Sequence, residues 1–118
     1  LHLHKRLNMW LQPGGHIDDG EHPRDAAVRE SHEELGLAVT HPPDGALLMH
    51  VDVHPGPRGH RHFDLRYLLL AGDDDPQPGV DESPHAGWFS PDEAFAVADP
   101  GLRGGLAVAL RTYVRYRE

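Results

Sequence analysis

The sequence predicts a single α/β (α+β) domain, covering residues 1–118, in which a mixed β-sheet lies between helices. Three observations lead to this expectation. Before and after one well-delimited helix, the sequence contains short segments of strand length in which apolar and polar residues alternate or in which most residues are apolar. Two further helices are predicted near the C-terminus, and neither a linker nor an internal repeat divides the chain. With 118 residues, the chain can bury one modest core.

The first strand candidate is the segment 1–12, where apolar and polar side chains alternate at first and then less regularly. Four later segments also have the length and pattern of strands, at residues 37–40, 46–53, 60–71 and 86–89. The longest of them ends in an apolar run, which predicts burial on both faces of the sheet.

Loops are predicted between these strands. The sequence HPPDG at residues 41–45 is a strong turn signal, and HPGPRG at residues 54–59 is expected to be a loop. Residues 72–84 are polar and rich in proline and aspartate. A loop of about thirteen residues in a compact domain is typically functional or mobile.

The central helix is predicted over residues 23–35. Pro23 suits the first helical position, where its missing N–H costs nothing, and Asp25 places negative charge in the first turn. Gly36 follows where a left-handed residue would end the helix. The segment would be roughly 20 Å long at 1.5 Å per residue.

The two C-terminal helices are predicted from different signals. Ser90, Pro91 and Glu93 form a capping box with proline at the first position, so a helix should run to about residue 98. Residues 99–105 are expected to be a loop. Residues 106–117 have apolar side chains on one side and arginines toward the end, which favours a last helix.

Three carboxylates lie within five residues of the central helix, at Glu30, Glu33 and Glu34. Helical positions three and four apart share a face, so Glu30 should lie beside both of the others. Like charges this close destabilise a helix, whereas a hard divalent cation such as Mg²⁺ prefers oxygen ligands and negative charge. The cluster therefore predicts a metal site.

The segment from residue 15 to residue 37 resembles the box of the Nudix hydrolase family. Its specified positions are occupied here by Gly15, Glu21, Arg29, Glu30, Glu33, Glu34, Gly36 and Leu37. One position departs from the pattern, because Ser31 stands where an aliphatic residue is usual, but serine is small enough to pack there. The resemblance implies the same fold as above. Members of this family usually carry another strand or more before the strand that corresponds to residues 1–12. We therefore expect that the given sequence lacks its natural N-terminal segment.

The resemblance also implies roles for individual residues. The box glutamates Glu30, Glu33 and Glu34 would bind Mg²⁺, or Mn²⁺ in its place, together with the backbone carbonyl of Gly14. Either Glu33 or the loop residue Glu82 would act as the general base. Glu21 and Arg29 would hold the loop against the helix by a salt bridge.

The implied activity is hydrolysis of the diphosphate bond of a nucleoside diphosphate linked to another group. Nucleoside triphosphates, as in MutT-like pyrophosphohydrolases, are the leading substrate class. ADP-ribose or another nucleotide sugar is the alternative, as is a non-catalytic nucleotide-sensing module. A sensor would usually have lost box glutamates, which are all present here. An isomerase of isoprenoid diphosphates shares the fold, but the chain lacks the cysteine that its chemistry uses.

Histidines and aromatic residues are open to several interpretations. The pairs His2 with His4 and His60 with His62 are spaced like metal ligands, but no third ligand accompanies them, so surface histidines or phosphate contacts are expected. The basic group around Lys5 is likewise expected to be an exposed strand end rather than a phosphate contact. Five aromatic residues could stack on a nucleobase: Trp10, Phe63, Tyr67, Trp88 and Phe89. Of these, Trp88 and Phe89 are expected to lie in the core instead.

Composition excludes several classes of protein. The chain has 11 Lys and Arg against 19 Asp and Glu, a net charge of −8, which argues against binding nucleic acid. The absence of cysteine excludes disulfides, zinc–thiolate sites and cysteine nucleophiles. No apolar run is long enough to cross a membrane. We therefore expect a cytoplasmic enzyme without a membrane partner, either alone or as a homodimer.

Overall fold

The computed structural model describes residues 1–3, 9–56 and 59–117. In chain order the elements are β1 His2–Leu3, β2 Trp10–Leu11, α1 Pro23–Leu35, β3 Val39–Thr40, β4 Leu48–Pro55, β5 Arg61–Tyr67, β6 Leu70–Ala71, α2 Pro91–Val97 and α3 Pro100–Arg117. The central helix has the predicted bounds. In the described residues, no helix has both the length and the apolar character needed to span a membrane.

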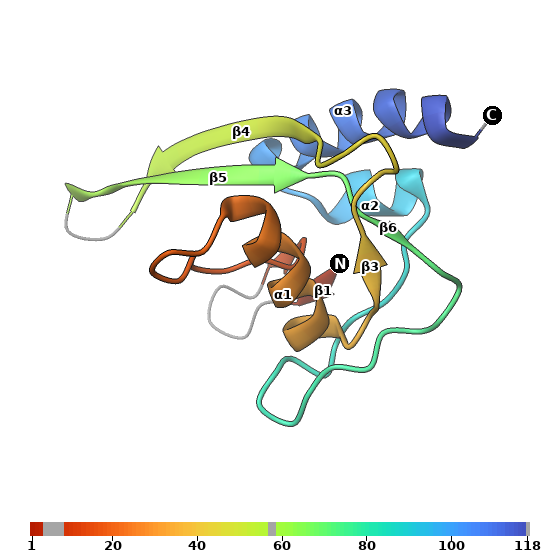
Figure 1. Cartoon of the computed structure of the whole chain (residues 1–118), viewed down its shortest axis with the longest axis horizontal. Coiled ribbons are helices and arrows are strands. Elements are labelled where there is room, and N and C mark those ends of the chain that lie inside the picture. Colours follow the sequence, from red (N-terminus) through yellow and green to blue (C-terminus); the bar gives the residue numbers. More distant parts are fainter. Residues whose placement is uncertain (4–8, 57–58, 118) are drawn as a thin grey trace.

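The β4–β5 ladder is the longest strand pairing among the described residues. Its strands are antiparallel, with Asp52 opposite Asp64 and His54 opposite His62. Helix α3 packs along β4 on one side of the ladder and α1 lies on the other, beside β5 (Figure 1). The predicted fold class, strands between helices, is confirmed.

The sheet differs in detail from the prediction of one mixed sheet. All pairings between the described strands are antiparallel, and they form three two-stranded ladders: β1–β2, β3–β6 and β4–β5. Residues 1–12 were expected to form one strand, but His2 pairs with Leu11 across two different strands. Residues 4–8, with the basic group around Lys5, lie outside the described residues.

The segment 60–71 is divided rather than continuous. After Tyr67, the N–H of Leu68 donates to the carbonyl of Leu47, and the chain then pairs Leu70 with Thr40 in another ladder. An apolar run shows that residues are buried but not where a strand changes partner. Similarly, residues 86–89 contribute only an isolated bridge, from Ala86 to His2, and β4 extends two residues beyond its predicted end to Pro55.

Helix α3 begins at Pro100, so the loop predicted over residues 99–105 is wrong. The Asp99 side chain accepts a hydrogen bond from the N–H of Leu102 at 3.0 Å, which caps the first turn. The glycines that suggested a loop instead allow close packing. A Cβ on Gly105 would lie 2.8 Å from Cδ of Arg66 on β5. Tertiary packing outweighs the low helix propensity of glycine here.

The apolar core is small and lies between the helices and the strands. Its buried members are Ala26, Leu35, Leu37, Leu68, Ala94, Ala98 and Leu102. Trp88, expected in the core, is 55% exposed, and its indole N–H donates to the carbonyl of Asp74. Phe89 is half-buried and contacts the ring of Trp10 edge-on.

Candidate active site

The three box glutamates lie on helix α1, whose two ends are fixed by specific capping contacts. His22 caps the start, where its Nδ1 accepts from the N–H of Arg24 at 3.2 Å. Gly36 ends the helix with φ of 64°, and its N–H donates to the carbonyl of His32. This left-handed geometry favours glycine. Ser31, the departure from the box, is buried and donates to the Ala27 carbonyl at 2.8 Å, so it packs as expected.

The guanidinium of Arg29 binds several groups around the helix. It contacts both carboxylate oxygens of Glu21 at 2.9 and 3.0 Å, which confirms the expected salt bridge and lowers the pKa of Glu21. The same group donates to Glu30 at 2.9 Å and to Glu33 at 3.1 Å. Arg29 therefore offsets part of the repulsion between the glutamates.

Glu34 is the most enclosed of the three glutamates. Its Oε2 accepts a hydrogen bond from the N–H of Gly14 at 3.3 Å and lies 3.1 Å from Nε2 of His2. The pKa of Glu34 is raised to about 8, first by burial and then by the negative charges of Glu30 and Glu82, against the hydrogen bond from Gly14. Burial and the neighbouring carboxylates therefore both disfavour the charged form of Glu34.

The loop between β6 and α2 brings Glu82 to this place. The N–H of Gln77 donates to the carbonyl of Leu35, and a Cβ on Gly36 would collide with the backbone of Gln77. A turn follows in which the N–H of Glu82 donates to the carbonyl of Gly79. The loop is thus held against the C-terminal end of α1, where Glu34 lies.

The structure therefore places some of the predicted site residues close to one another and others apart. Glu34 contacts Glu30 and is close enough to Glu82 to be affected by its charge, but the carboxylate oxygens of these three residues do not all lie within 4.8 Å of one another. Gly14 is beside Glu34 through its N–H. Glu33 has a half-exposed side chain and faces Arg29. Which of these residues bind metal or act as the base stays a prediction.

His2 was missed as a neighbour of Glu34. The sequence showed it only as one of a histidine pair, and its contact with Glu34 joins residues 32 positions apart. It is buried, and it also bridges to Ala86 through the backbone. No signal in the local pattern could have placed it.

The donor chemistry of the site fits a divalent cation. Carboxylate oxygens are the ligands that Mg²⁺ and Mn²⁺ prefer. Burial and mutual repulsion disfavour charge on Glu34, and a cation would reverse that effect. A Cβ on Gly15 would lie 2.6 Å from Oε1 of Glu30, so the loop backbone also passes close to the carboxylates.

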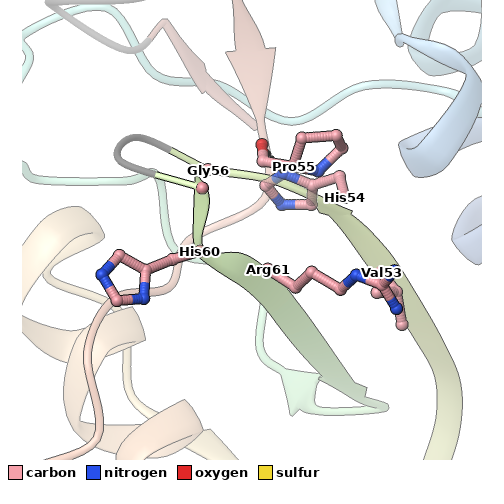
Figure 2. Close-up of a pocket in the computed structure, with 7 residues that line it drawn as sticks. Val53, His54, Pro55, Gly56, His60 and Arg61 are labelled. Carbon is pink, nitrogen blue, oxygen red and sulfur yellow. Dashed lines mark hydrogen bonds between the residues drawn. The ribbon is translucent and has the colours of Figure 1, made fainter.

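A hollow of about 320 Å³ lies elsewhere, at the end of the β4–β5 ladder where the chain passes from β4 to β5 (Figure 2). It is lined by Val53, His54, Pro55, Gly56, Gly59, His60 and Arg61. None of these residues belongs to the glutamate box. The hollow is therefore not where the predicted chemistry resides.

Comparison with known proteins decides the family. A family model described as the NUDIX domain matches residues 2–111. The chain belongs to the Nudix family. The family resemblance is thus confirmed over nearly the whole chain, well beyond the box that first indicated it.

Relatives of this Nudix chain are named as hydrolases, pyrophosphohydrolases or diphosphatases. An RNA pyrophosphohydrolase of Cereibacter sphaeroides is 33% identical over 121 aligned residues, covering 88% of this chain and 73% of the relative. An m7GpppN-mRNA hydrolase of Bos taurus is 31% identical over 107 residues, covering 77% and 34%. An 8-oxo-dGTP diphosphatase of Proteus vulgaris is 36% identical over 61 residues, covering 52% and 49%. The chain spans less than half the length of the last two relatives.

Solved structures agree with the Nudix assignment. A NUDIX family hydrolase from Clostridium perfringens superposes with a TM-score of 0.71 at 30% identity, covering 92% of this chain and 82% of that one. An Ap4A hydrolase from C. elegans has a TM-score of 0.73 at 24% identity, covering 98% and 83%. The second comparison supports the fold alone.

Proposed function

We propose that this Nudix protein hydrolyses the diphosphate bond of a nucleotide with the help of Mg²⁺, for which Mn²⁺ can substitute. The observation that carries the proposal is the burial of two box glutamates on α1, whose side chains are only 14% exposed at Glu30 and 12% at Glu34, with the charge of Glu82 nearby. The glutamates of a solvated acidic helix face would be far more exposed.

Glu30 and Glu34 are the proposed ligands, with Glu33 and the carbonyl of Gly14 completing the set. A bound dication supplies charge neutralisation to the phosphate oxygens and the leaving group. Arg29 positions Glu30 and Glu33 through hydrogen bonds of 2.9 and 3.1 Å. Such outer contacts hold ligands in place and typically support metal affinity.

Hydrolysis also needs a group that accepts a proton from water. As the water oxygen bonds to phosphorus, the anhydride oxygen leaves with the electron pair of the broken bond, and the water proton passes to a carboxylate. We propose Glu82 as this base, ahead of Glu33. Glu82 lies close enough to Glu34 to raise its pKa, whereas Glu33 is occupied by Arg29.

A free nucleoside triphosphate is the proposed substrate class. The relatives named for RNA or mRNA make an RNA 5′ end the second candidate, supported by the RNA pyrophosphohydrolase that aligns over 88% of this chain. The net charge of −8 disfavours a long polyanion. ADP-ribose or another nucleotide sugar, and a nucleotide sensor without activity, are the remaining alternatives.

The test is phosphate release from nucleoside triphosphates, a 5′-triphosphate RNA, ADP-ribose and a dinucleoside polyphosphate, with Mg²⁺ and with chelator. We expect turnover that disappears with chelator and falls by about 100-fold or more in Glu34→Gln and Glu82→Gln. Asp73→Asn, a neutralised carboxylate in the same loop as Glu82, is the matched control and should retain wild-type turnover.

Two results would contradict the proposal in different ways. Turnover that survives in Glu82→Gln but not in Glu33→Gln would reassign the base. Nucleotide and Mg²⁺ binding without turnover of any substrate would favour the sensor. The cytoplasmic location and the homodimer stay predictions, to be checked by fractionation and by sedimentation.

A further inference from the structure

A second group of metal-binding side chains lies on the β4–β5 ladder, outside the glutamate box. Asp52 and His54 are two residues apart on β4, so their side chains share one face. Their partners across the ladder are Asp64 and His62. Two neighbouring cross-strand pairs thus present two carboxylates and two imidazoles to the same side.

The ligand atoms of three of these residues already converge. One ligand atom each from Asp52, His54 and Asp64 lie within 4.8 Å of one another. Within the part of the chain that the structure describes, no other three acidic or histidine side chains meet this criterion, and the box glutamates do not. The His54 Nε2 atom is 3.2 Å from Oδ2 of Asp64.

Hydrogen bonding orients the imidazole of His54 for ligation. Its Nδ1 is 3.3 Å from the carbonyl of Pro55, which can only accept, so the pairing fits a proton on Nδ1. Without an ion, Nε2 must carry a proton to hydrogen-bond to Oδ2 of Asp64, 3.2 Å away. A metal ion bound between these two atoms would take the place of that proton. Metal-binding histidines are commonly oriented by such a backbone carbonyl.

The surroundings hold the carboxylates but leave them accessible. Arg66, buried behind them, forms ion pairs with Asp52 at 3.9 Å and Asp64 at 3.8 Å, both longer than hydrogen bonds. The single positive charge of Arg66 balances only one of the two carboxylates, so the group keeps negative charge that can attract a cation. The His54 and Asp64 side chains are 44% and 38% exposed, so an ion can reach them.

A fourth donor lies next to this group. The rings of His54 and His62 are 5.4 Å apart between centroids. The His62 ring occupies the space where any side chain at Gly56 would stand, so glycine there allows its position.

We propose that Asp52, His54 and Asp64 bind one first-row transition-metal dication, for which Zn²⁺ is the best match, with His62 or water as the fourth ligand. Imidazole with carboxylate suits zinc in four-coordinate sites, whereas Mg²⁺ prefers oxygen ligands alone. The site shares no residue with the glutamate box, so it is independent of the proposed hydrolysis.

The test is a Zn²⁺ titration by calorimetry, with Mg²⁺ in large excess to occupy oxygen-only sites. We expect one zinc per chain in the wild type. The affinity should fall by about tenfold or more in His54→Gln and in Asp64→Asn, since each removes a direct ligand. Glu34→Gln, in the box, and His60→Gln, an exposed histidine of the same hairpin, should bind zinc like the wild type.

A second measurement needs no substitution. In the wild type, Zn²⁺ should shift the assigned imidazole NMR signals of His54 before those of His60 and the other exposed histidines. Equal loss of zinc binding in His60→Gln, or unchanged binding in His54→Gln, would overturn the proposal. So would zinc-induced shifts that leave the His54 signals in place.

Discussion

Single residues with several partners hold the glutamate site together. Arg29 binds Glu21, Glu30 and Glu33, so repulsion between the glutamates is offset by an internal cation as well as by a metal. Gly36 has a comparable role in the backbone. It ends α1 and gives room to the loop that carries Glu82.

Gly36→Ala should therefore be costly. A left-handed residue with a Cβ costs about 1–2 kcal/mol, and contact with the Gln77 backbone adds to this. We expect the free energy of unfolding, measured in urea, to fall by at least that amount, and turnover to fall because the Glu82 loop is displaced. Gly72→Ala is the control, since nothing lies within 4 Å of its Cβ. Equal destabilisation by both would show that the collision does not matter.

Among the elements, α2 shows most directly how side chains define a helix. The Ser90 hydroxyl accepts from the N–H of Glu93 at 3.2 Å, and the Glu93 carboxylate accepts from the N–H of Ser90 at 3.0 Å. These reciprocal bonds are the predicted capping box. They also lower the pKa of Glu93, mainly through the bond to the Ser90 backbone.

This cap predicts a defined dependence of stability on pH. Because the pKa of Glu93 is lower in the folded than in the unfolded chain, its stabilisation is complete above the ordinary value of 4.5 and is lost as the pH falls through the folded value. At pH 7, Glu93→Gln should have a lower free energy of unfolding than wild type. The difference in unfolding free energy between the two proteins should become smaller as the pH is lowered toward 3. Ser90→Ala should cost about 0.5–2 kcal/mol. A Glu93→Gln deficit that stays constant with pH would contradict this.

On the scale of the whole molecule, the site joins parts of the chain that are far apart in sequence. His2 from β1, the loop around Gly14, helix α1 and the loop with Glu82 meet at one end of α1. The β4–β5 ladder and α3 form the other side of the molecule (Figure 1). Binding an ion at this junction should therefore stabilise the fold as a whole.

We expect Mg²⁺ to raise the unfolding free energy of the wild type by about 2.7 kcal/mol at about 100 times its Kd. Glu34→Gln should be more stable than wild type in chelator, because it removes a carboxyl whose charge is disfavoured in the folded chain by burial, Glu30 and Glu82, and should gain little from Mg²⁺. Thermal or urea unfolding with Mg²⁺ and with chelator measures both effects. If Mg²⁺ stabilised wild type and Glu34→Gln equally, the ion would have to bind at a site that does not include Glu34.

The sequence by itself determined the features set by neighbouring residues. Pro23 and Gly36 delimit α1, Ser90 caps α2, and the spacing of Glu21, Arg29 and the three glutamates identifies the Nudix box. These features depend on local geometry, in which proline, glycine and side-chain caps act within one helical turn. The structure confirmed them at the predicted positions.

Tertiary structure alone decided the features set by distant partners. Packing of Gly105 on Arg66 makes helix where glycine favours a loop, and the chain changes partner after Tyr67 within an apolar run. Contacts over long separations likewise put His2 and Glu82 beside Glu34, and cross-strand register put Asp64 beside His54. The energy of such contacts depends on three-dimensional proximity, which a one-dimensional pattern does not contain.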